Sequence, residues 1–97
     1  MNEAVLLPLN NGDILTRVTK YNLIRSGRML YIDVHEALAG KLAGKFVAVP
    51  NLINIVAVQE YQGTGETEKE ALGDCLDKIK GVAFEAIFPR RETPDGP

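Results

Sequence analysis

Two segments of alternating polarity, on either side of Ser26 and Gly27, constrain the fold of this chain more than any other feature. Glycine readily adopts the positive φ of a tight turn, so residues 14–25 and the segment that starts at residue 28 are predicted to pair as an antiparallel hairpin. With a two-residue loop, one face of the hairpin becomes mostly apolar and the other becomes polar. The facing pairs on the apolar side are Arg25 with Arg28, Leu23 with Leu30, Tyr21 with Ile32 and Thr19 with Val34, and those on the polar side are Lys20 with Asp33 and Asn22 with Tyr31. A slip of one residue would mix the two faces, so the pattern predicts one specific register.

A capped amphipathic helix at residues 67–80 is the second strong pattern. Thr67 precedes Glu70 by three positions, as in a capping box whose hydroxyl accepts from the N3 amide and whose carboxylate accepts from the cap amide. Gly81 supplies the C-terminal stop. The residues that recur at helical spacing and are predicted to face the core are Ala71, Leu72, Cys75, Leu76 and Ile79.

The segments before residue 62 predict further short strands. The sequence "AVLLPL" at 4–9 precedes "NNGD", whose Asn-Gly pair is typical of a hairpin turn, so it is expected to be a strand. Strands are also expected at "KFVAV", residues 45–49, and at "INIVAVQEYQ", residues 53–62. These segments and the two strands around Ser26 and Gly27 bring the expected number to about five.

Two segments are expected to be short connections. Leu38 and Leu42 stand four apart in residues 35–44, so this stretch is predicted to be a connector with one helical turn. The sequence "VAFEAIFP" after the helix is predicted to be a short turn or strand that buries three apolar side chains. These are Phe84, Ile87 and Phe88.

A chain of 97 residues has room for one domain with one modest core. We therefore expect a single α+β domain at residues 1–89, followed by a disordered polar tail at 90–97. Its architecture is predicted as a bent antiparallel sheet or small barrel of about five strands, followed and closed by one amphipathic helix at 67–80.

The apolar segments and the cysteine content bear on location. The longest strongly apolar run, at 52–58, is much shorter than the roughly 20 residues of a membrane helix, and the acidic start does not resemble a signal peptide. Cys75 is the only cysteine, so the chain cannot form an internal disulfide or a cysteine-based metal cluster. We expect a cytoplasmic protein without a membrane segment.

Charge is distributed unevenly along the chain, although the net charge is only −2. Residues 14–32 contain four cations and no acid, and they define a possible patch for nucleic acid or a protein partner: Arg17, Lys20, Arg25 and Arg28. Residues 59–77 contain six acids against a single lysine, and a possible acidic partner face comprises Glu66, Glu68, Asp74 and Asp77. These runs can be two solvated faces, or they can dock electrostatically, including in self-association. Tyr21 and Tyr31 beside the arginines would suit single-stranded nucleic acid, but the slightly acidic net charge argues against a typical duplex-binding surface.

The residues that carry chemistry give little indication of an enzyme. In the Gly63-x-Gly65 stretch, Glu68 occupies the position of the third glycine of a dinucleotide-binding loop, and the acids at the helix start would repel phosphate. His35 is followed by Ala39 where a metalloprotease would have a second histidine. Cys75 lies on the predicted buried stripe, which favours a core residue over a nucleophile. We predict no catalytic site, no metal site and no cofactor.

Two partial resemblances to known families can be stated on particular motifs. "GETEKEAL" at 65–72 resembles the G-x-T-x-x-E-A-L helix start of HicB-like antitoxin domains, and "FVAVPNL" before it resembles their preceding strand, so the likeness spans about residues 46–81. It implies neutralisation of a small toxin. The strand-rich part at about residues 5–60, with its "NNGDIL" turn, is similar to Sm-like small barrels. That resemblance implies a ring that binds RNA.

The combined prediction is a small cytoplasmic, non-catalytic interaction module. We expect it to be a homo-oligomer or to bind another protein, because the edges of a sheet in so small a domain need covering. The alternatives are an Sm-like RNA-binding protein and a HicB-like antitoxin.

Overall fold

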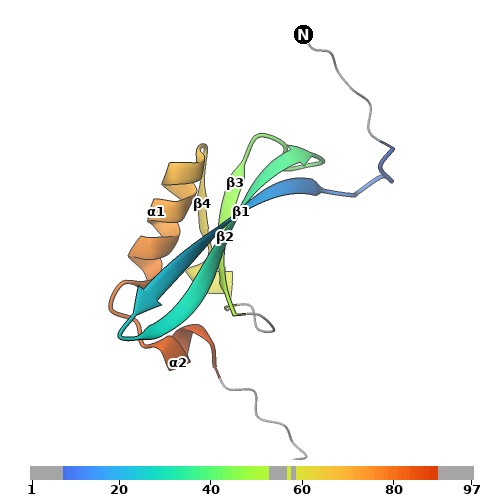
Figure 1. The fold of residues 1–97 in the computed structure, drawn as a ribbon. Coiled ribbons are helices and arrows are strands. Elements are labelled where there is room, and N and C mark those ends of the chain that lie inside the picture. Colours follow the sequence, from blue (N-terminus) through green and yellow to red (C-terminus); the bar gives the residue numbers. More distant parts are fainter. Residues whose placement is uncertain (1–7, 53–56, 58, 90–97) are drawn as a thin grey trace, which may run out of the picture.

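The structure is a computed structural model of the chain, and it describes residues 8–52, 57 and 59–89. These residues form one antiparallel sheet whose longest helix follows the last strand in the chain, which confirms the α+β class (Figure 1). The strands are β1 (Leu15–Arg25), β2 (Arg28–Ala39), β3 (Phe46–Asn51) and β4 (Gly63–Gly65), and the helices are η1 (Gln59–Tyr61), α1 (Glu68–Ile79) and α2 (Phe84–Ile87). The strand order is β1-β2-β3-β4.

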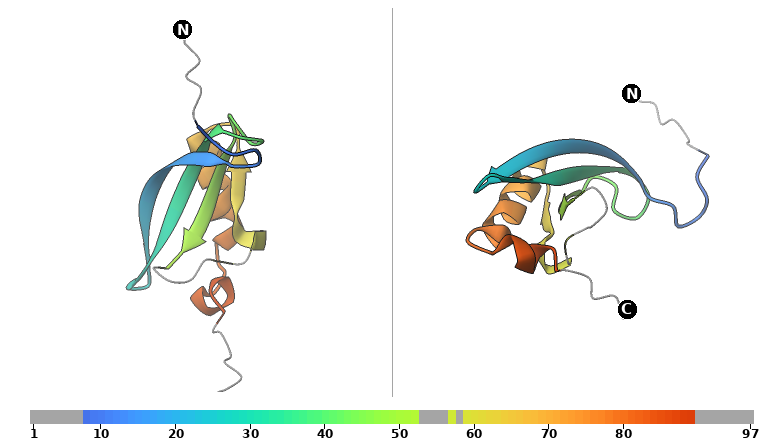
Figure 2. Two further views of the ribbon diagram at one scale, coloured as in Figure 1. Left: turned by 90° about the vertical axis from the view of Figure 1, so that its right-hand side faces the viewer. Right: turned by 60° about the horizontal axis from the view of Figure 1, so that its bottom comes forward.

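The sheet is strongly bent, and α1 and α2 lie on its concave side (Figure 2). Helix α1 makes most of its contacts with β4 and β3, and fewer with β2. The two edges of the sheet are β1 and β4, and within the described residues they do not pair with each other. The predicted bent sheet is therefore confirmed, whereas the barrel alternative is wrong for this part of the chain.

The hairpin around Ser26 and Gly27 has the predicted register. Both loop residues have positive φ, 51° at Ser26 and 77° at Gly27, as a tight two-residue turn between twisted strands requires. Arg25 faces Arg28, and every other predicted pair is present, down to Thr19 opposite Val34. The alternation of apolar and polar residues is thus sufficient to predict the pairing of these two strands.

The helical turn predicted within residues 35–44 is wrong, because β2 continues to Ala39. The Ala37 N–H donates to the Lys45 carbonyl at 3.0 Å, and the Ala37 carbonyl accepts from the Gly44 N–H at 2.9 Å. These bonds join β2 to the segment before β3 and occupy the backbone groups that a helical turn would need. Tertiary pairing therefore overrides the helical spacing of the leucines, and the chain reverses at 40–44.

The predicted number of about five strands is also wrong, because the described residues form four. In the predicted strand at 53–62, Ala57 has no regular structure and 59–61 form η1, while 53–56 and 58 lie outside the described residues. Most of the predicted strand at 4–9 lies outside them too. The "NNGD" turn is present, since the Asp13 N–H donates to the Asn10 carbonyl at 3.0 Å.

The strand β4 contains the Gly63-x-Gly65 stretch, and its glycines let it approach α1 closely. Neither Gly63 nor Gly65 has a positive φ. A Cβ atom on Gly63 would lie 2.3 Å from both the Ala71 carbonyl oxygen and the Cys75 nitrogen, and one on Gly65 would lie 2.6 Å from the Glu70 Cβ. The glycines are therefore required by the contact between strand and helix rather than by a turn or a phosphate.

Helix α1 begins as predicted, with one difference in its cap. The Thr67 hydroxyl accepts from the Glu70 N–H at 3.1 Å, but the Glu70 carboxylate accepts from the amide of Glu66, at 2.9 Å, rather than from that of Thr67. Gly81, with φ of 72°, follows the helix as predicted. The prediction that Leu76 faces the core is wrong, because this side chain is 36% exposed.

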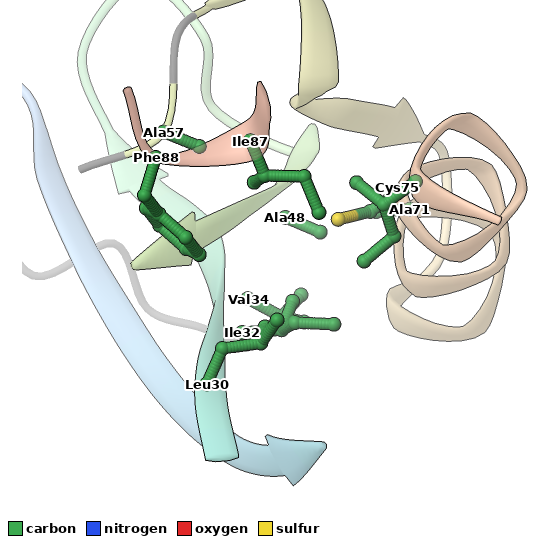
Figure 3. Close-up of a cluster of buried hydrophobic side chains, with 10 residues drawn as sticks. Leu30, Ile32, Val34, Ala48, Ala57, Ala71, Cys75, Ile87 and Phe88 are labelled. Carbon is green, nitrogen blue, oxygen red and sulfur yellow. The ribbon is translucent and has the colours of Figure 1, made fainter. Parts of the chain in front are cut away.

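The core lies between the concave face of the sheet and the helices (Figure 3). Its members come from β2, β3, α1 and the C-terminal segment, and they include Leu30, Ile32, Val34, Ala48, Ala71, Cys75, Ile79, Ile87 and Phe88. Phe84 is half-buried and its ring centroid lies 5.2 Å from that of Phe88. The three apolar side chains of 84–88 are therefore buried or half-buried, much as predicted, although the segment forms the short helix α2 rather than a turn or strand. The predicted tail at 90–97 lies outside the described residues.

In the described part of the chain, no helix combines the length and the apolar character needed to cross a membrane.

Candidate functional site

Two of the four predicted patch cations form ion pairs across β1 and β2. Arg17 Nη2 lies 3.0 Å from Glu36 Oε1, and Lys20 Nζ lies 2.8 Å from Asp33 Oδ1. Lys20 also lies 4.7 Å from the centroid of the Tyr31 ring. Residues 17 and 20 differ by an odd number, so their side chains leave opposite faces of the sheet.

The other two cations bind the C-terminal part of the helical layer. Arg25 Nη1 donates to the carbonyl of Ile79 at 2.9 Å and to that of Val82 at 3.1 Å, where a cation complements the end of α1. Arg28 pairs with Glu85 at 2.7 Å and lies 3.9 Å from the centroid of the Phe84 ring. All four predicted patch residues thus have partners within the chain and are not brought together as one basic surface.

Glu85 shows the electrostatic consequence of this arrangement. The hydrogen bond from Arg28 lowers the pKa of the Glu85 carboxyl below its ordinary value, with smaller help from a backbone hydrogen bond and the Arg28 charge. The pair is exposed, so it neutralises charge more than it stabilises the fold.

The predicted acidic face is also divided among separate partners. Glu66 pairs with Lys45 in the β2–β3 loop, and Glu68 accepts a hydrogen bond from the Tyr21 hydroxyl. The bond to Glu68 is the main reason that the pKa of Tyr21 is raised, followed by burial and the Glu68 charge.

Asp74 is used to seal the edge of the sheet at β4. Its carboxylate accepts from the Thr64 N–H at 3.0 Å and pairs with Lys78 at 3.2 Å. The Thr64 amide, and then Lys78, hold the pKa of Asp74 below its ordinary value. Asp77 is exposed and makes no side-chain hydrogen bond or ion pair with the residues described. Among the described ion pairs, none joins the basic segment 14–32 to the acidic segment 59–77.

The structure does not bring the single cysteine and the single histidine together. Cys75 is fully buried in α1, and burial raises its pKa to about 11, with a smaller contribution from Asp74. His35 lies in β2 on the outer side of the sheet, where its Nδ1 is 3.0 Å from the Thr16 hydroxyl. The described residues contain no group of three or more His, Cys, Asp or Glu side chains arranged to hold a metal ion.

Two hollows on the surface are open grooves. The larger, about 380 Å³, lies beside the start of β3 and the end of β4 and is lined by Leu42, Lys45, Phe46, Val47, Thr64, Gly65 and Glu66. Its lysine and glutamate pair with each other. The smaller, about 220 Å³, lies beside the β1–β2 turn, where Arg25 and Arg28 already bind carbonyl and carboxylate oxygens. Neither groove offers an unused charged group among its lining residues.

The backbone of β1 provides the most distinctive surface. The two-residue turn makes Arg25 and Arg28 a pair that exchanges backbone hydrogen bonds. In an antiparallel ladder such pairs alternate with pairs that exchange none, so every second residue of β1 bonds to β2. The residues between these pairs direct their N–H and C=O groups away from β2. We call these four residues the β1 edge. They are Val18, Lys20, Asn22 and Ile24.

In the described part of the chain, nothing covers the β1 edge. No backbone or side-chain group of residues 8–52, 57 or 59–89 forms a hydrogen bond with these backbone groups. In Figure 2, β1 borders one side of the sheet and both helices lie under its concave face. Two side chains of the β1 edge are exposed and apolar, Val18 at 48% and Ile24 at 70%.

Of the residues on the β1 edge, only Lys20 was a predicted site residue. The prediction that an edge of the sheet needs covering did not say which edge. The signal was nevertheless in the sequence, because the two-residue loop at Ser26 and Gly27 determines which residues of β1 point their backbone away from β2.

Comparison with protein-family models, curated proteins and solved structures finds no match. The resemblances to HicB-like and Sm-like domains therefore stay predictions, and the function has to be argued from the residues of this chain.

Proposed function

We propose that this protein is a cytoplasmic, non-catalytic interaction module that associates with itself. The observation that carries the proposal is the β1 edge, in a strand of 11 residues that no other described segment covers. An unpaired strand edge is a template for another strand, since its backbone donors and acceptors are already aligned.

The character of β1 supports an interface more than a protected edge. Proteins protect exposed edges with lysine and other charged side chains, proline, bulges, short strands or inward-pointing charges. The stretch from Thr16 to Arg25 contains no proline, and the only irregularity in its pairing lies before it, between Leu15 and Thr16. Lys20 is the one charge on the β1 edge, and Asp33 offsets it.

The non-catalytic part of the proposal rests on how the chain uses its chemically active groups. The Cys75 thiol is buried and its pKa is about 11, so it is a poor source of thiolate. The acids in and just before α1 take separate partners: Glu68 accepts from Tyr21 in β1, Asp74 from Thr64 in β4, and Glu66 from Lys45 in the β2–β3 loop. They act as structural acceptors in separate places.

RNA binding and toxin neutralisation remain alternatives that follow from the two family resemblances. For RNA binding, Arg25 and Arg28 would have to give up their contacts with α1, Val82 and Glu85. Changing both arginines to glutamate should weaken RNA binding and flatten its salt dependence if this alternative holds. Absence of binding by the unchanged protein at low salt would remove it.

Self-association is tested by sedimentation velocity and light scattering over protein concentrations from about 1 μM to about 1 mM. We expect the mean mass to rise with concentration from that of one chain of 10.6 kDa toward twice that value. A constant mass of one chain over the whole range would refute the proposal.

A further inference from the structure

We infer that the β1 edge pairs with the β1 edge of a second copy, in antiparallel orientation, about a two-fold axis at Tyr21. This inference rests on the proposed self-association and specifies its site and register. The result is a continuous sheet in which the two β1 strands lie side by side at the centre.

The backbone carries the first step. Val18, Lys20, Asn22 and Ile24 all direct their N–H and C=O groups to the same side of β1. When the two edges pair with the axis at Tyr21, each of these residues faces another member of the same set. Four hydrogen-bonded pairs would then form, with about eight N–H to carbonyl bonds in total.

The side chains select this register among the alternatives. With the axis at Tyr21, Val18 faces Ile24 of the second copy and Lys20 faces Asn22 of the second copy. The exposed apolar side chains therefore cover each other, and the lysine meets a neutral amide that can accept from it. The register with the axis at Lys20 would instead place Val18 opposite Asn22 and Ile24 opposite Thr16, so the two exposed apolar side chains would not cover each other. The register with the axis at Asn22 would leave Val18 opposite Ser26.

The charges of the surrounding residues are compatible with this pairing. Lys20 keeps Asp33 as its partner at 2.8 Å. On the other face, Arg17 would stand opposite Arg25 of the second copy, and this like-charge contact opposes the pairing unless each cation is already neutralised. Glu36 already pairs with Arg17, and two backbone carbonyls already bind Arg25, so neither cation is without a partner.

The opposite edge of the sheet explains why pairing should stop at two copies. The strand β4 has only three residues, and the Asp74 carboxylate occupies the outward N–H of Thr64. Pairing of β1 with β1 uses the same surface of both copies and leaves only the sealed β4 edges exposed. Such a two-fold contact closes on itself, so we expect a dimer rather than a fibre.

The main test compares Asn22→Pro with Asn22→Ala. Proline removes the N–H that points to the second copy and places its ring there, and proline is tolerated at outward positions of edge strands. Alanine keeps this N–H and serves as the matched control. We expect the dissociation constant of the dimer to rise at least about tenfold with proline and to change less than about threefold with alanine. Far-UV circular dichroism of each variant checks that the monomer is folded.

A second variant, Asn22→Glu, tests the register and does not depend on proline. In the proposed register, the new carboxylate of each copy faces Lys20 of the other copy, so one such contact forms on each side of the two-fold axis. The dimer should then bind several-fold more tightly at low salt, and the gain should disappear near 1 M salt, where charges are screened over about 3 Å. In the register with the axis at Asn22, two carboxylates would face each other and the dimer would weaken.

The outcomes separate this inference from the function it rests on. A wild-type chain that remains monomeric overturns both. A dimer that survives Asn22→Pro with a folded chain overturns the β1 pairing but keeps self-association. A dimer that is weakened or unchanged by Asn22→Glu overturns the proposed register.

Discussion

The two edges of the sheet are built in opposite ways. At β4, the strand is three residues long, its glycines lie against α1, and the Thr64 N–H donates to Asp74 at 3.0 Å. At β1, the strand is 11 residues long, and its outward groups meet no other described residue. A helix and one carboxylate are thus enough to seal a short edge, whereas a long edge requires a strand of comparable length. The predictions below begin at the sealed edge and end at the β1 edge.

The largest effect is expected for Gly63→Ala. A Cβ atom at this position would lie 2.3 Å from two backbone atoms of α1, so the strand and the helix would have to separate. We expect the free energy of unfolding to fall by about 3 kcal/mol or more, as for severe overpacking. Urea denaturation followed by circular dichroism measures this change.

Gly73→Ala is the matched control for Gly63→Ala. Gly73 lies within α1, and a Cβ atom there would have no neighbour within 4 Å. Alanine is the better helix former, so this change should stabilise the protein by about 0.5–1 kcal/mol. If both substitutions had the same sign, the close contact between β4 and α1 would not be the reason for the glycine at position 63.

Thr67→Ala should have a smaller effect, since it removes the hydroxyl that accepts from the Glu70 N–H at 3.1 Å. Loss of such a cap typically costs about 1 kcal/mol. Thr67→Ser keeps the acceptor and should be close to neutral. An unfolding midpoint that does not move with alanine would mean that the cap contributes nothing to the helix beside β4.

Asp74→Asn tests the seal through the dependence of stability on pH. The folded pKa of Asp74 is lowered, so its charge stabilises the protein above the ordinary carboxyl pKa of 3.8, and this contribution is lost as the pH falls through the folded value. Asparagine keeps an oxygen that can accept from Thr64 but carries no charge. We expect the variant to be less stable than the wild type at pH 7.

The difference between wild type and Asp74→Asn should then shrink as the pH falls below 3.8. Urea denaturation of both proteins at several pH values between 2 and 7 measures it. A difference that stays constant over this range would show that the charge of Asp74 does not contribute to the seal.

Ile24→Thr at the β1 edge should have the smallest effect on the monomer. The Ile24 side chain is 70% exposed, and threonine keeps the β-branched shape that strands favour. At protein concentrations low enough to keep the chain monomeric, the free energy of unfolding should change by less than about 0.5 kcal/mol. A loss of more than that would mean that β1 is already covered within one chain.

Local sequence patterns were sufficient for the hairpin and for the helix start. The alternation around Ser26 and Gly27 predicted every facing pair from Arg25–Arg28 to Thr19–Val34. Thr67 and Gly81 predicted the two ends of α1 to within about one residue. These features depend on residues that are close in the chain, so their energetics can be read from the sequence.

The candidate site was harder to predict, because its charges take partners from distant segments. Arg25 binds Ile79 and Arg28 binds Glu85, 54 and 57 residues away along the chain. A run of four cations without an acid therefore looked like one basic patch in the sequence, although each cation has its own partner in the fold and Lys20 leaves the opposite face of the sheet from Arg17. The pattern recorded where the charges are in the chain, but not which groups neutralise them.

The sequence by itself determined the register of β1 and β2, the capped helix and the α+β class, because each follows from backbone preferences and from the period of apolar residues. Only the tertiary structure decided that 63–65 form a strand, that residues 35–39 extend β2, and that one edge is sealed by Asp74. These features depend on what lies across from a segment. A strand of three residues, two of them glycine, has no pattern of its own, and it is defined by β3 on one side and α1 on the other.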